Sequence, residues 1–282
     1  MKPVRILIDS TVDLPERCRA QVRAVSLTVH FGDEELIDGV TIDRRRFYER
    51  LIESDVLPTT SQATPAAFAK EFEAVRQAGE SAVVITISAE LSGTYQSACI
   101  AAADYEDIYV VDSRSAAIGS GILAELALEW AADGIAAAEL ARLLTKKRDD
   151  ICLLGLLDTL EYLRRGGRIS RTAALAGGLL GIKPVVTLEN GAVTMIGKAR
   201  GSKQGNNLLV QKVRESGGID FSLPILLGYT GLSDALLQKY VADSAALWRD
   251  HCGSLEQTLL CSVIGTHTGP GVVAVAFFKN GV

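Results

Sequence analysis

Apolar, β-branched runs alternate with helical segments throughout the first half of this 282-residue chain. Three of these runs are short and clear: Val4–Ile8, Ala82–Ile87 and Ile108–Val111. Strands that alternate with helices in this way favour a mostly parallel sheet covered by helices on both faces. We therefore expect an α/β fold with an N-terminal domain over residues 1–148, and a boundary near Arg148–Asp150.

The second half has more β-rich runs in succession. Asn190-Gly191 separates two of them and is typical of a hairpin turn. We expect the last two strands at Glu256–Ile264 and Val272–Phe278, with helices such as Asp234–Cys252 before them. This pattern predicts a C-terminal domain over residues 149–282 that contains a mixed α/β sheet.

Composition excludes several classes of protein. A hydrophobic content of 48% is ample for a buried core, while a net charge of −5 and a pI near 5.4 argue against binding to nucleic acid or an anionic membrane. The five cysteines lack zinc-ligand spacing, so we expect them to be reduced, and we expect no metal site. No segment resembles a signal peptide or the roughly 20 apolar residues of a membrane span, so we expect a cytoplasmic protein without an integral membrane segment.

Two hydroxyl-rich turns carry the main functional signal. Thr60-Ser61-Gln62 precedes a helix that Thr64 caps and Pro65 begins, and Leu91-Ser92-Gly93-Thr94 follows the apolar run Ala82–Ile87. Ordinary helix capping explains such residues by itself. A helix N-terminus behind a hydroxyl-rich turn also offers free N–H groups to a phosphate or carboxylate.

Polar groups also follow two other predicted strands, at Asp9-Ser10-Thr11 and at Asp112-Ser113. Ligands of parallel α/β sheets bind outside the carboxyl ends of the strands. The four strand ends therefore indicate one anion-binding site at this edge of the sheet.

Three further features leave alternatives open. His267 lies in a glycine-rich segment that we expect to be a loop between two strands, where it could donate to a carboxylate, or act as the base for Ser92 in an acyl hydrolase or transferase. Gly119–Ala124 matches a dinucleotide fingerprint in letters, but the preceding strand ends too far away for the tight turn that this motif needs. The glycines are better explained as allowing close packing of a helix. The basic clusters Arg164–Arg168 and Lys198–Lys203 could be solvated surface, or could bind phosphate or a partner.

The order of eight motifs resembles the DegV family of bacterial fatty-acid-binding proteins, and the resemblance covers essentially the whole chain. Ala63 is a departure, because many members have proline there. The motifs are Asp9-Ser10-Thr11-Val12-Asp13-Leu14-Pro15, Thr60-Ser61-Gln62, Leu91-Ser92-Gly93-Thr94-Tyr95, Val111-Asp112-Ser113, Arg165-Gly166-Gly167-Arg168-Ile169, Gly181-Ile182-Lys183-Pro184, Arg200-Gly201-Ser202-Lys203 and His267-Thr268-Gly269-Pro270-Gly271.

The resemblance implies a DegV-like fold of two domains that holds one long-chain fatty acid between them. It further implies a carrier without catalytic residues or a cofactor of its own, which presents the carboxylate to a separate ATP-dependent fatty acid kinase for acyl phosphate formation and phospholipid synthesis. Arg200 would contact the kinase or a phosphate. The residues implied to bind the carboxylate are Thr60, Ser92 and His267, supported by Ser61, Gly93 and Thr94.

Overall fold

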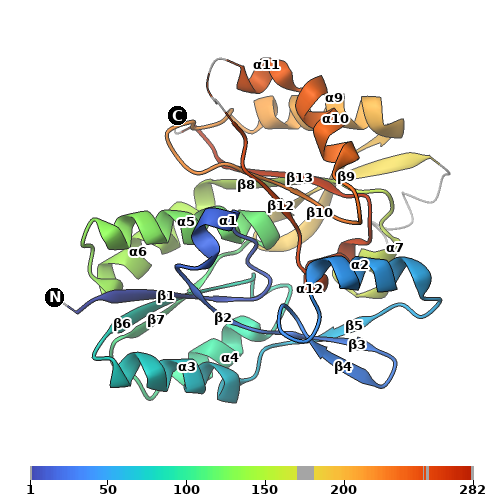
Figure 1. Ribbon diagram of the computed structural model, residues 1–282. Helices are drawn as coiled ribbons and strands as arrows, with labels where there is room; N and C mark the ends of the chain where they lie inside the picture. The colour runs from blue at the N-terminus through green and yellow to red at the C-terminus, as the bar shows by residue number, and fades with distance from the viewer. Residues whose placement is uncertain (1, 170–180, 250, 252–253, 281–282) are drawn as a thin grey trace.

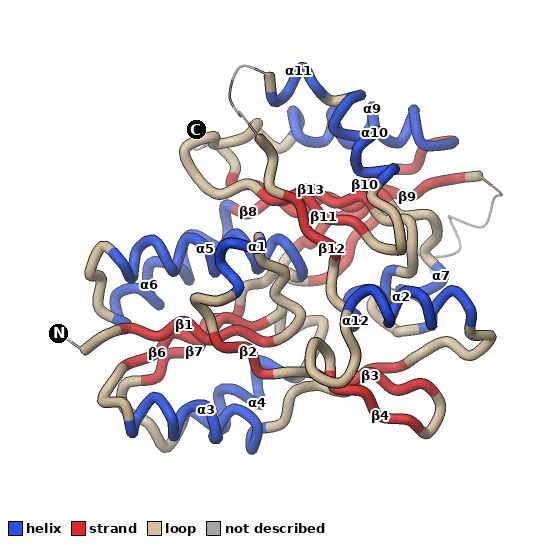
Figure 2. Tube along the Cα trace, in the orientation of Figure 1, coloured by secondary structure: helices blue, strands red, loops and turns tan. Residues whose placement is uncertain are grey.

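The computed structural model describes residues 2–169, 181–249, 251 and 254–280. Over these residues it has three β-sheets, of four, six and three strands. In Figures 1 and 2 the two larger sheets lie one above the other, with helices between them and on their outer faces. The expected α/β architecture is therefore confirmed.

The four-stranded sheet is parallel, in the order β2-β1-β6-β7. Helices α3 and α4 cover one of its faces, and α5 and α6 cover the other, as the alternation of strands and helices predicts. The bounds are β1 Val4–Asp9, β2 Arg23–Val25, β6 Ser81–Thr86, β7 Ile108–Asp112, α3 Pro65–Gln77, α4 Thr94–Ala102, α5 Ala117–Ala132 and α6 Ala137–Lys147.

A small antiparallel sheet, in the order β4-β3-β5, lies beside the parallel one. The apolar run Val25–Phe31 predicts a single strand, and this prediction is wrong, because the chain leaves the parallel sheet after Val25 and enters the small sheet at Thr28. The hydroxyl of Ser10 accepts the N–H of Leu27 at 3.1 Å and fixes this change of direction. The bounds are α1 Glu16–Arg19, β3 Thr28–Phe31, β4 Glu34–Ile37, α2 Arg44–Glu53 and β5 Thr59–Ser61.

The six-stranded sheet is mixed, in the order β10-β9-β8-β13-β11-β12. Asn190 and Gly191 have φ angles of 51° and 85°, so the predicted hairpin between β9 and β10 is confirmed. The bounds are η1 Arg148–Asp150, β8 Ile151–Leu156, α7 Glu161–Arg165, β9 Ile182–Glu189, β10 Ala192–Arg200, α9 Gly201–Glu215, β11 Leu226–Tyr229, α10 Ala235–Asp243, α11 Ala245–Trp248, β12 Gln257–Leu259, α12 Ser262–Thr268 and β13 Val273–Phe278.

Two expected elements of this half need correction. The strand predicted at Glu256–Ile264 ends at Leu259, and helix α12 begins at Ser262, so His267 lies on a helix rather than in a loop between strands. The single helix expected over Asp234–Cys252 is interrupted at Ser244. A helix expected at 171–180 lies outside the described residues.

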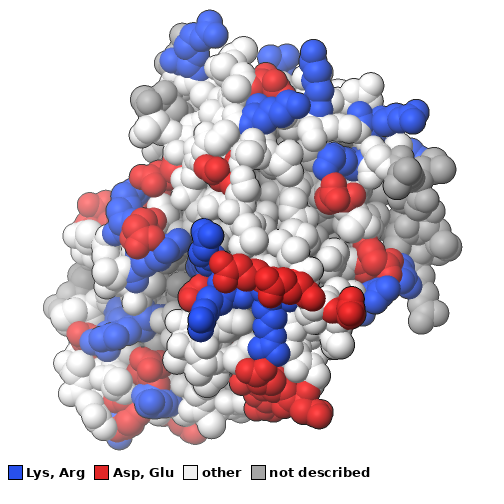
Figure 3. All heavy atoms as spheres, turned by 45° about the vertical axis from the view of Figure 1, so that its right-hand side comes forward, with Lys and Arg blue, Asp and Glu red and all other residues white. Residues whose placement is uncertain are grey.

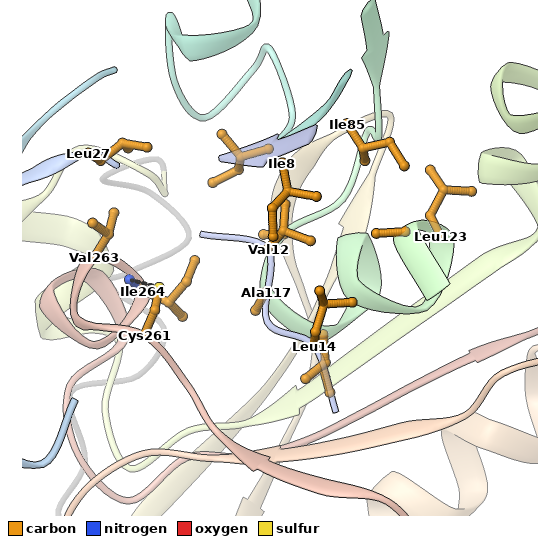
Figure 4. Packing of buried hydrophobic residues seen from close by; sticks show 14 of the residues in the cluster. Ile8, Val12, Leu14, Leu27, Ile85, Ala117, Leu123, Cys261, Val263 and Ile264 are labelled. Atoms are coloured by element: carbon orange, nitrogen blue, oxygen red, sulfur yellow. Dashed lines mark hydrogen bonds between the residues drawn. The ribbon is translucent and has the colours of Figure 1, made fainter. Parts of the chain in front are cut away.

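Helix α5 lies between the two larger sheets and contacts strands of both (Figure 1). Every residue from Ala117 to Ala127 is buried, and Figure 4 shows Leu123 and Ala117 among side chains from β1, β6 and α12. A Cβ on Gly121 would lie 1.9 Å from the carbonyl oxygen of Asp13, so the glycines of this helix permit close packing, as we expected for Gly119–Ala124.

The boundary near Arg148–Asp150 stays a prediction. Helix η1 leads directly into β8 there, while contacts of α5 with β13, and of α12 with α2, join the two halves of the chain. Four cysteines fall within the described residues, and all four are free thiols. None of the helices in the described ranges is long and apolar enough to cross a membrane.

Candidate functional site

A cavity of about 380 Å³ lies between the carboxyl ends of the parallel strands and the inner face of the six-stranded sheet. Its size is within the usual range of about 300–1,000 Å³ for small-molecule sites. Most of its wall is aliphatic. Examples from the two halves of the chain are Leu27, Ile87, Leu153, Leu157, Val186 and Val272.

The polar residues of the wall include most of those proposed from the sequence. Five of them line this one cavity, and so does an arginine that we had placed only in a basic cluster: Thr60, Ser61, Ser92, Gly93, His267 and Arg168. Segments that lie more than 200 residues apart in the chain therefore meet at one site. Two proposed residues, Thr94 and Arg200, do not line the cavity.

Thr60 and His267 form the link between the two halves of the site. Thr60 is the middle residue of β5, and His267 is in the last turn of α12. The distance from the Thr60 Oγ1 to the His267 Nε2 is 2.8 Å. If the imidazole donates here, the threonine hydroxyl is left to donate its own proton to a ligand.

The histidine is a neutral group at neutral pH. Burial, and then the positive charge of Arg168, lower the pKa of His267 to about 4. Its Nδ1 is buried without a hydrogen-bond partner among the described residues and lies against Gly166, where a Cβ would approach it to 2.2 Å. His267 can thus orient a hydroxyl, but it cannot supply the positive charge of an anion site.

Arg168 is the one charged side chain in the described wall of the cavity. It follows α7 in the chain and its guanidinium donates from Nε to the carbonyl of Leu91 at 3.2 Å and from Nη1 to the carbonyl of Gly166 at 2.5 Å. These bonds hold it against the turn that contains Ser92. The sequence reasoning missed this residue, although the two glycines before it signal a segment where backbone and side chains pack closely.

The turn at Ser92 forms the start of α4. The Ser92 hydroxyl lies 2.9 Å from the Thr94 hydroxyl and accepts the Thr94 N–H at 3.2 Å. Gly93 lines the cavity, and its N–H forms no hydrogen bond within the described residues. Thr94 therefore supports Ser92 without lining the cavity, while Ser92 and Gly93 both line it.

Gln62 lines the cavity beside Gly93. Its Nε2 donates to the hydroxyl of Ser97 on α4 at 2.8 Å, and a Cβ on Gly93 would lie 2.1 Å from its Oε1. Thr64 caps α3 by accepting the N–H of Ala67, and Pro65 begins the helix, as predicted. Substitution of the usual proline by Ala63 leaves that cap in place.

Ser61 has a different role from its neighbour. Side chains alternate along a strand, and the Ser61 hydroxyl bonds to the Nε2 of His30 at 2.8 Å.

Arg200 is the last residue of β10, exposed, and its N–H donates to the Gln204 side chain at 3.1 Å. It lies two residues after Lys198, which pairs with Pro184, and the carbonyl of Pro184 accepts the N–H of the wall residue Leu157 at 2.9 Å.

Asp9 fixes the sheet edge beneath the site. Its carboxylate accepts the N–H of Thr11 at 2.8 Å, the Thr11 hydroxyl at 2.5 Å and the N–H of Ile87 at 2.7 Å. Complete burial raises the pKa of Asp9 to about 6, against the effect of these hydrogen bonds. It joins the end of β1 to the residue after β6, and Ile87 belongs to the cavity wall.

The geometry does not form the dyad of a serine hydrolase. Ser92 bonds to Thr94 and His267 bonds to Thr60, and these two described residues share no hydrogen bond with each other. No group of three or more potential metal ligands occurs among the residues that the structure describes. The arrangement suits reversible binding of an anion with an apolar tail.

On the face shown in Figure 3, Lys and Arg side chains are interspersed with Asp and Glu. Within the described part of this face they form no continuous basic surface of the kind that tracks a nucleic-acid backbone.

Comparisons with known proteins cover almost the whole chain. Residues 3–280 match the model of a family described as "Uncharacterised protein, DegV family". A DegV domain-containing protein of Caldanaerobacter subterraneus subsp. tengcongensis is 33% identical over 98% of this chain and 99% of its own length. Another, from Streptomyces coelicolor, is 32% identical over 96% and 97%.

Solved structures agree with these relatives. The fold is similar to that of a DegV family protein from Thermus thermophilus described by its fatty acid binding, with 30% identity, a TM-score of 0.87, and coverage of 99% of this chain and 100% of that one. It is also similar to a DegV lipid-binding protein from Thermotoga maritima, with 26% identity, a TM-score of 0.87 and coverage of 99% and 98%.

Proposed function

Because this chain belongs to the DegV family, we propose that its cavity binds one long-chain fatty acid, with the carboxylate at the polar end. The observation that carries the proposal is the combination of an aliphatic cavity with hydroxyls, a free amide and one guanidinium gathered at one place in its wall. The fatty acid binding of the Thermus thermophilus relative supports the same ligand class.

Different polar groups bind the carboxylate from different sides. Thr60 donates through its hydroxyl, which the neutral His267 orients. Ser92 and the N–H of Gly93 donate from the other side, and Arg168 balances the negative charge. Hydrogen bonds to a charged group contribute about 1.5–3 kcal/mol each, so the site favours the ionised acid over an ester.

The apolar wall provides most of the affinity. At about 0.8 kcal/mol for each buried CH₂, a tail of fourteen methylenes offers on the order of 11 kcal/mol before the costs of association. The head group then mainly fixes orientation, with the carboxylate toward the turns at Thr60 and Ser92 and the tail against the aliphatic wall. No cofactor is needed for binding of this kind.

We further propose that the protein presents the bound carboxylate to a separate ATP-dependent fatty acid kinase, which forms the acyl phosphate in the cytoplasm. Ser61 and Gln62 are exposed beside Thr60, so the head-group end of the cavity lies near the surface, where a partner could approach it. Arg200 is exposed and does not line this cavity, a location suited to contact with the partner rather than with lipid.

Native mass spectrometry of protein purified from bacteria tests the binding proposal. We expect one long-chain fatty acid per chain, released by organic extraction, and uptake of added oleate by delipidated protein. Protein that contains no stoichiometric lipid, and takes up neither palmitate nor oleate, would contradict it.

Arg200→Ala tests presentation separately from binding. We expect this variant to load oleate as the parent does but to support little acyl phosphate formation with the cognate kinase. Arg200→Lys should be impaired less, because an ammonium keeps the charge but not the paired donors of a guanidinium. Normal phosphorylation of the alanine variant would remove Arg200 from the mechanism, and an empty variant would move it into the binding site.

The hydrolase alternative has its own test. It requires ester cleavage that Ser92→Ala abolishes, and such turnover would establish an enzyme. We expect none above the background rate, because the Ser92 hydroxyl is bonded to Thr94 rather than to a base.

A further inference from the structure

Two buried carboxylates hold the N-terminal end of α12. Asp13 accepts the N–H of Cys261 at 3.1 and 3.3 Å, and Asp38 accepts the N–H of Ser262 at 3.2 Å. These amides have no partner within their own helix, and negative charge near them is favourable. Side chains from the first forty residues therefore fix the place where this late helix begins.

Helix α2 holds the same segment from a second direction. Arg44 pairs with Asp13 at 2.9 Å and also donates to the carbonyl of Leu259, and the Tyr48 hydroxyl donates to the carbonyl of Leu260 at 3.1 Å. A Cβ on Gly265 would lie 2.6 Å from that hydroxyl, so α12 packs directly against α2. The position of α12 is thus set by Asp13, Asp38 and Arg44 together.

Helix α12 also contributes to the wall of the proposed fatty-acid site. Val263, Ile264, His267 and Thr268 all line the cavity, and His267 bonds to Thr60. Figure 4 shows Val263 and Ile264 projecting from this helix beside Cys261. His267 lies six positions after Cys261, which is a rise of about 9 Å along a helix, so a shift at the first residue moves the last.

We propose that Asp13, with Arg44 and Asp38, is a positioning residue for the fatty-acid site, and that its ionisation couples proton release to fatty-acid binding. The proposal rests on fatty-acid binding in the cavity described above. None of these three residues lines that cavity, and their side chains reach it through the segment that begins α12.

The surroundings of Asp13 make its charge responsive near neutral pH. The groups that face it are Arg44 and Tyr48 of α2, Arg19 of α1, Asp38, and Cys261 before α12. Burial raises the pKa of Asp13 to about 7, against the opposing effect of Arg44. A second cavity, of about 260 Å³, is lined by Asp38, Arg44 and Arg19 of this cluster.

The direction of the coupling follows from the hydrogen bonds. Ionised Asp13 holds the Cys261 amide more strongly than the protonated form does, because hydrogen bonds to a charged acceptor are roughly twice as strong. Binding that needs a fixed α12 therefore favours the ionised form. The affinity for oleate should fall by up to about tenfold as the pH is lowered from 8 to 6, and binding at pH 7 should release protons.

The experiment compares the parent with Asp13→Asn, a variant of the same shape that cannot ionise. Oleate affinity is measured from pH 6 to 8, and proton release is measured by titration calorimetry in buffers of different ionisation enthalpy. We expect the variant to bind about tenfold more weakly at pH 8, with a flatter pH profile and less proton release. Titration of the ligand itself is common to both proteins and cancels in the comparison.

Glu125→Gln is the matched control. Glu125 is buried on α5, pairs with Arg17, and has a pKa raised by burial, but it forms no hydrogen bond or ion pair with α12 among the described residues. It should cost stability without changing the pH profile of binding. An Asp13→Asn variant that is folded and keeps both the parental affinity and its profile would overturn the proposal.

Two further measurements keep the proposal testable if Asp13→Asn binds no fatty acid or does not fold. The chain has three histidines, so the ring resonances of His267 can be followed without ligand, and we expect Asp13→Asn to shift them. Unchanged resonances would count against positioning even if the protein bound no fatty acid, whereas a parent that does not bind oleate would refute the proposed function instead. If the variant does not fold, a parent affinity that is constant from pH 6 to 8, without proton release, would refute the coupling.

Discussion

Replacement of Thr60 by valine removes one hydroxyl from the carboxylate site while it keeps the shape of the side chain. The hydroxyl lies 2.8 Å from His267 Nε2 and is the donor that we assign to the fatty-acid carboxylate. Loss of a donor to a charged group costs about 1.5–3 kcal/mol, so the dissociation constant for oleate should rise roughly tenfold to a hundredfold.

The same substitution has a separate effect on stability. It leaves the half-buried Nε2 of His267 without its partner, which costs about 1–3 kcal/mol in both the free and the loaded protein. This cost lowers the Tm by a few degrees but cancels in the dissociation constant. Affinity and stability therefore report on two different bonds of one hydroxyl.

The assay is displacement of a fluorescent fatty acid by oleate and by methyl oleate at pH 8. Thr59→Val is the matched control, because Thr59 is the preceding residue of β5, exposed, and on the opposite face of the strand. We expect Thr60→Val to lose affinity for oleate but not for the ester, and Thr59→Val to match the parent for both. If Thr60→Val binds oleate as tightly as the parent does, the carboxylate lies elsewhere.

Four further substitutions or conditions have defined outcomes. Ser92→Ala should weaken oleate binding roughly tenfold to a hundredfold without unfolding the protein, as checked by displacement and circular dichroism. Arg168→Met should weaken binding of oleate but not of its ester, and should raise the pKa of His267 measured by NMR, because that charge lowers it now. The pKa of His267 is about 4, below its usual 6.5. The stability that neutral His267 contributes is therefore fully present above pH 6.5 and is lost as the pH falls toward 4. In denaturant titrations, a His267→Gln variant should lack this loss of stability. Gly265→Ala should destabilise the protein by about 1–3 kcal/mol, because the added methyl group meets the ring of Tyr48, and an unchanged Tm would show that α12 can move away.

Local signals in the sequence were sufficient for much of the fold and for one side of the site. Thr64 and Pro65 mark the start of α3, and Asn190-Gly191 marks a hairpin, because capping and left-handed turn geometry depend on neighbouring residues only. Ser92 follows β6 of the parallel sheet, as we expected from ligand sites at the carboxyl ends of strands. Thr60 does not follow a parallel strand, because it lies within β5 of the small antiparallel sheet, and the fold brings that sheet to the same cavity.

Long-range contacts explain what the sequence did not predict. The segment at Glu256–Ile264 has the apolar composition of a strand, yet α12 begins at Ser262 because Asp13 and Asp38, more than 220 residues earlier, accept its first amides. Arg168 reads as one charge in a basic cluster, and only the fold brings it to the carbonyl of Leu91 beside the cavity.

Helix α5 belongs to the cores of both large sheets, and this has a consequence for how the protein unfolds. A fragment that ended at residue 148 would keep this helix but lose the strands β8, β11 and β13 that cover one of its faces. Such a fragment should aggregate or remain partly unfolded, and the intact chain should melt in a single calorimetric transition rather than in two. The amides of α5 should then exchange with solvent only through global unfolding, as the slowest group in the molecule.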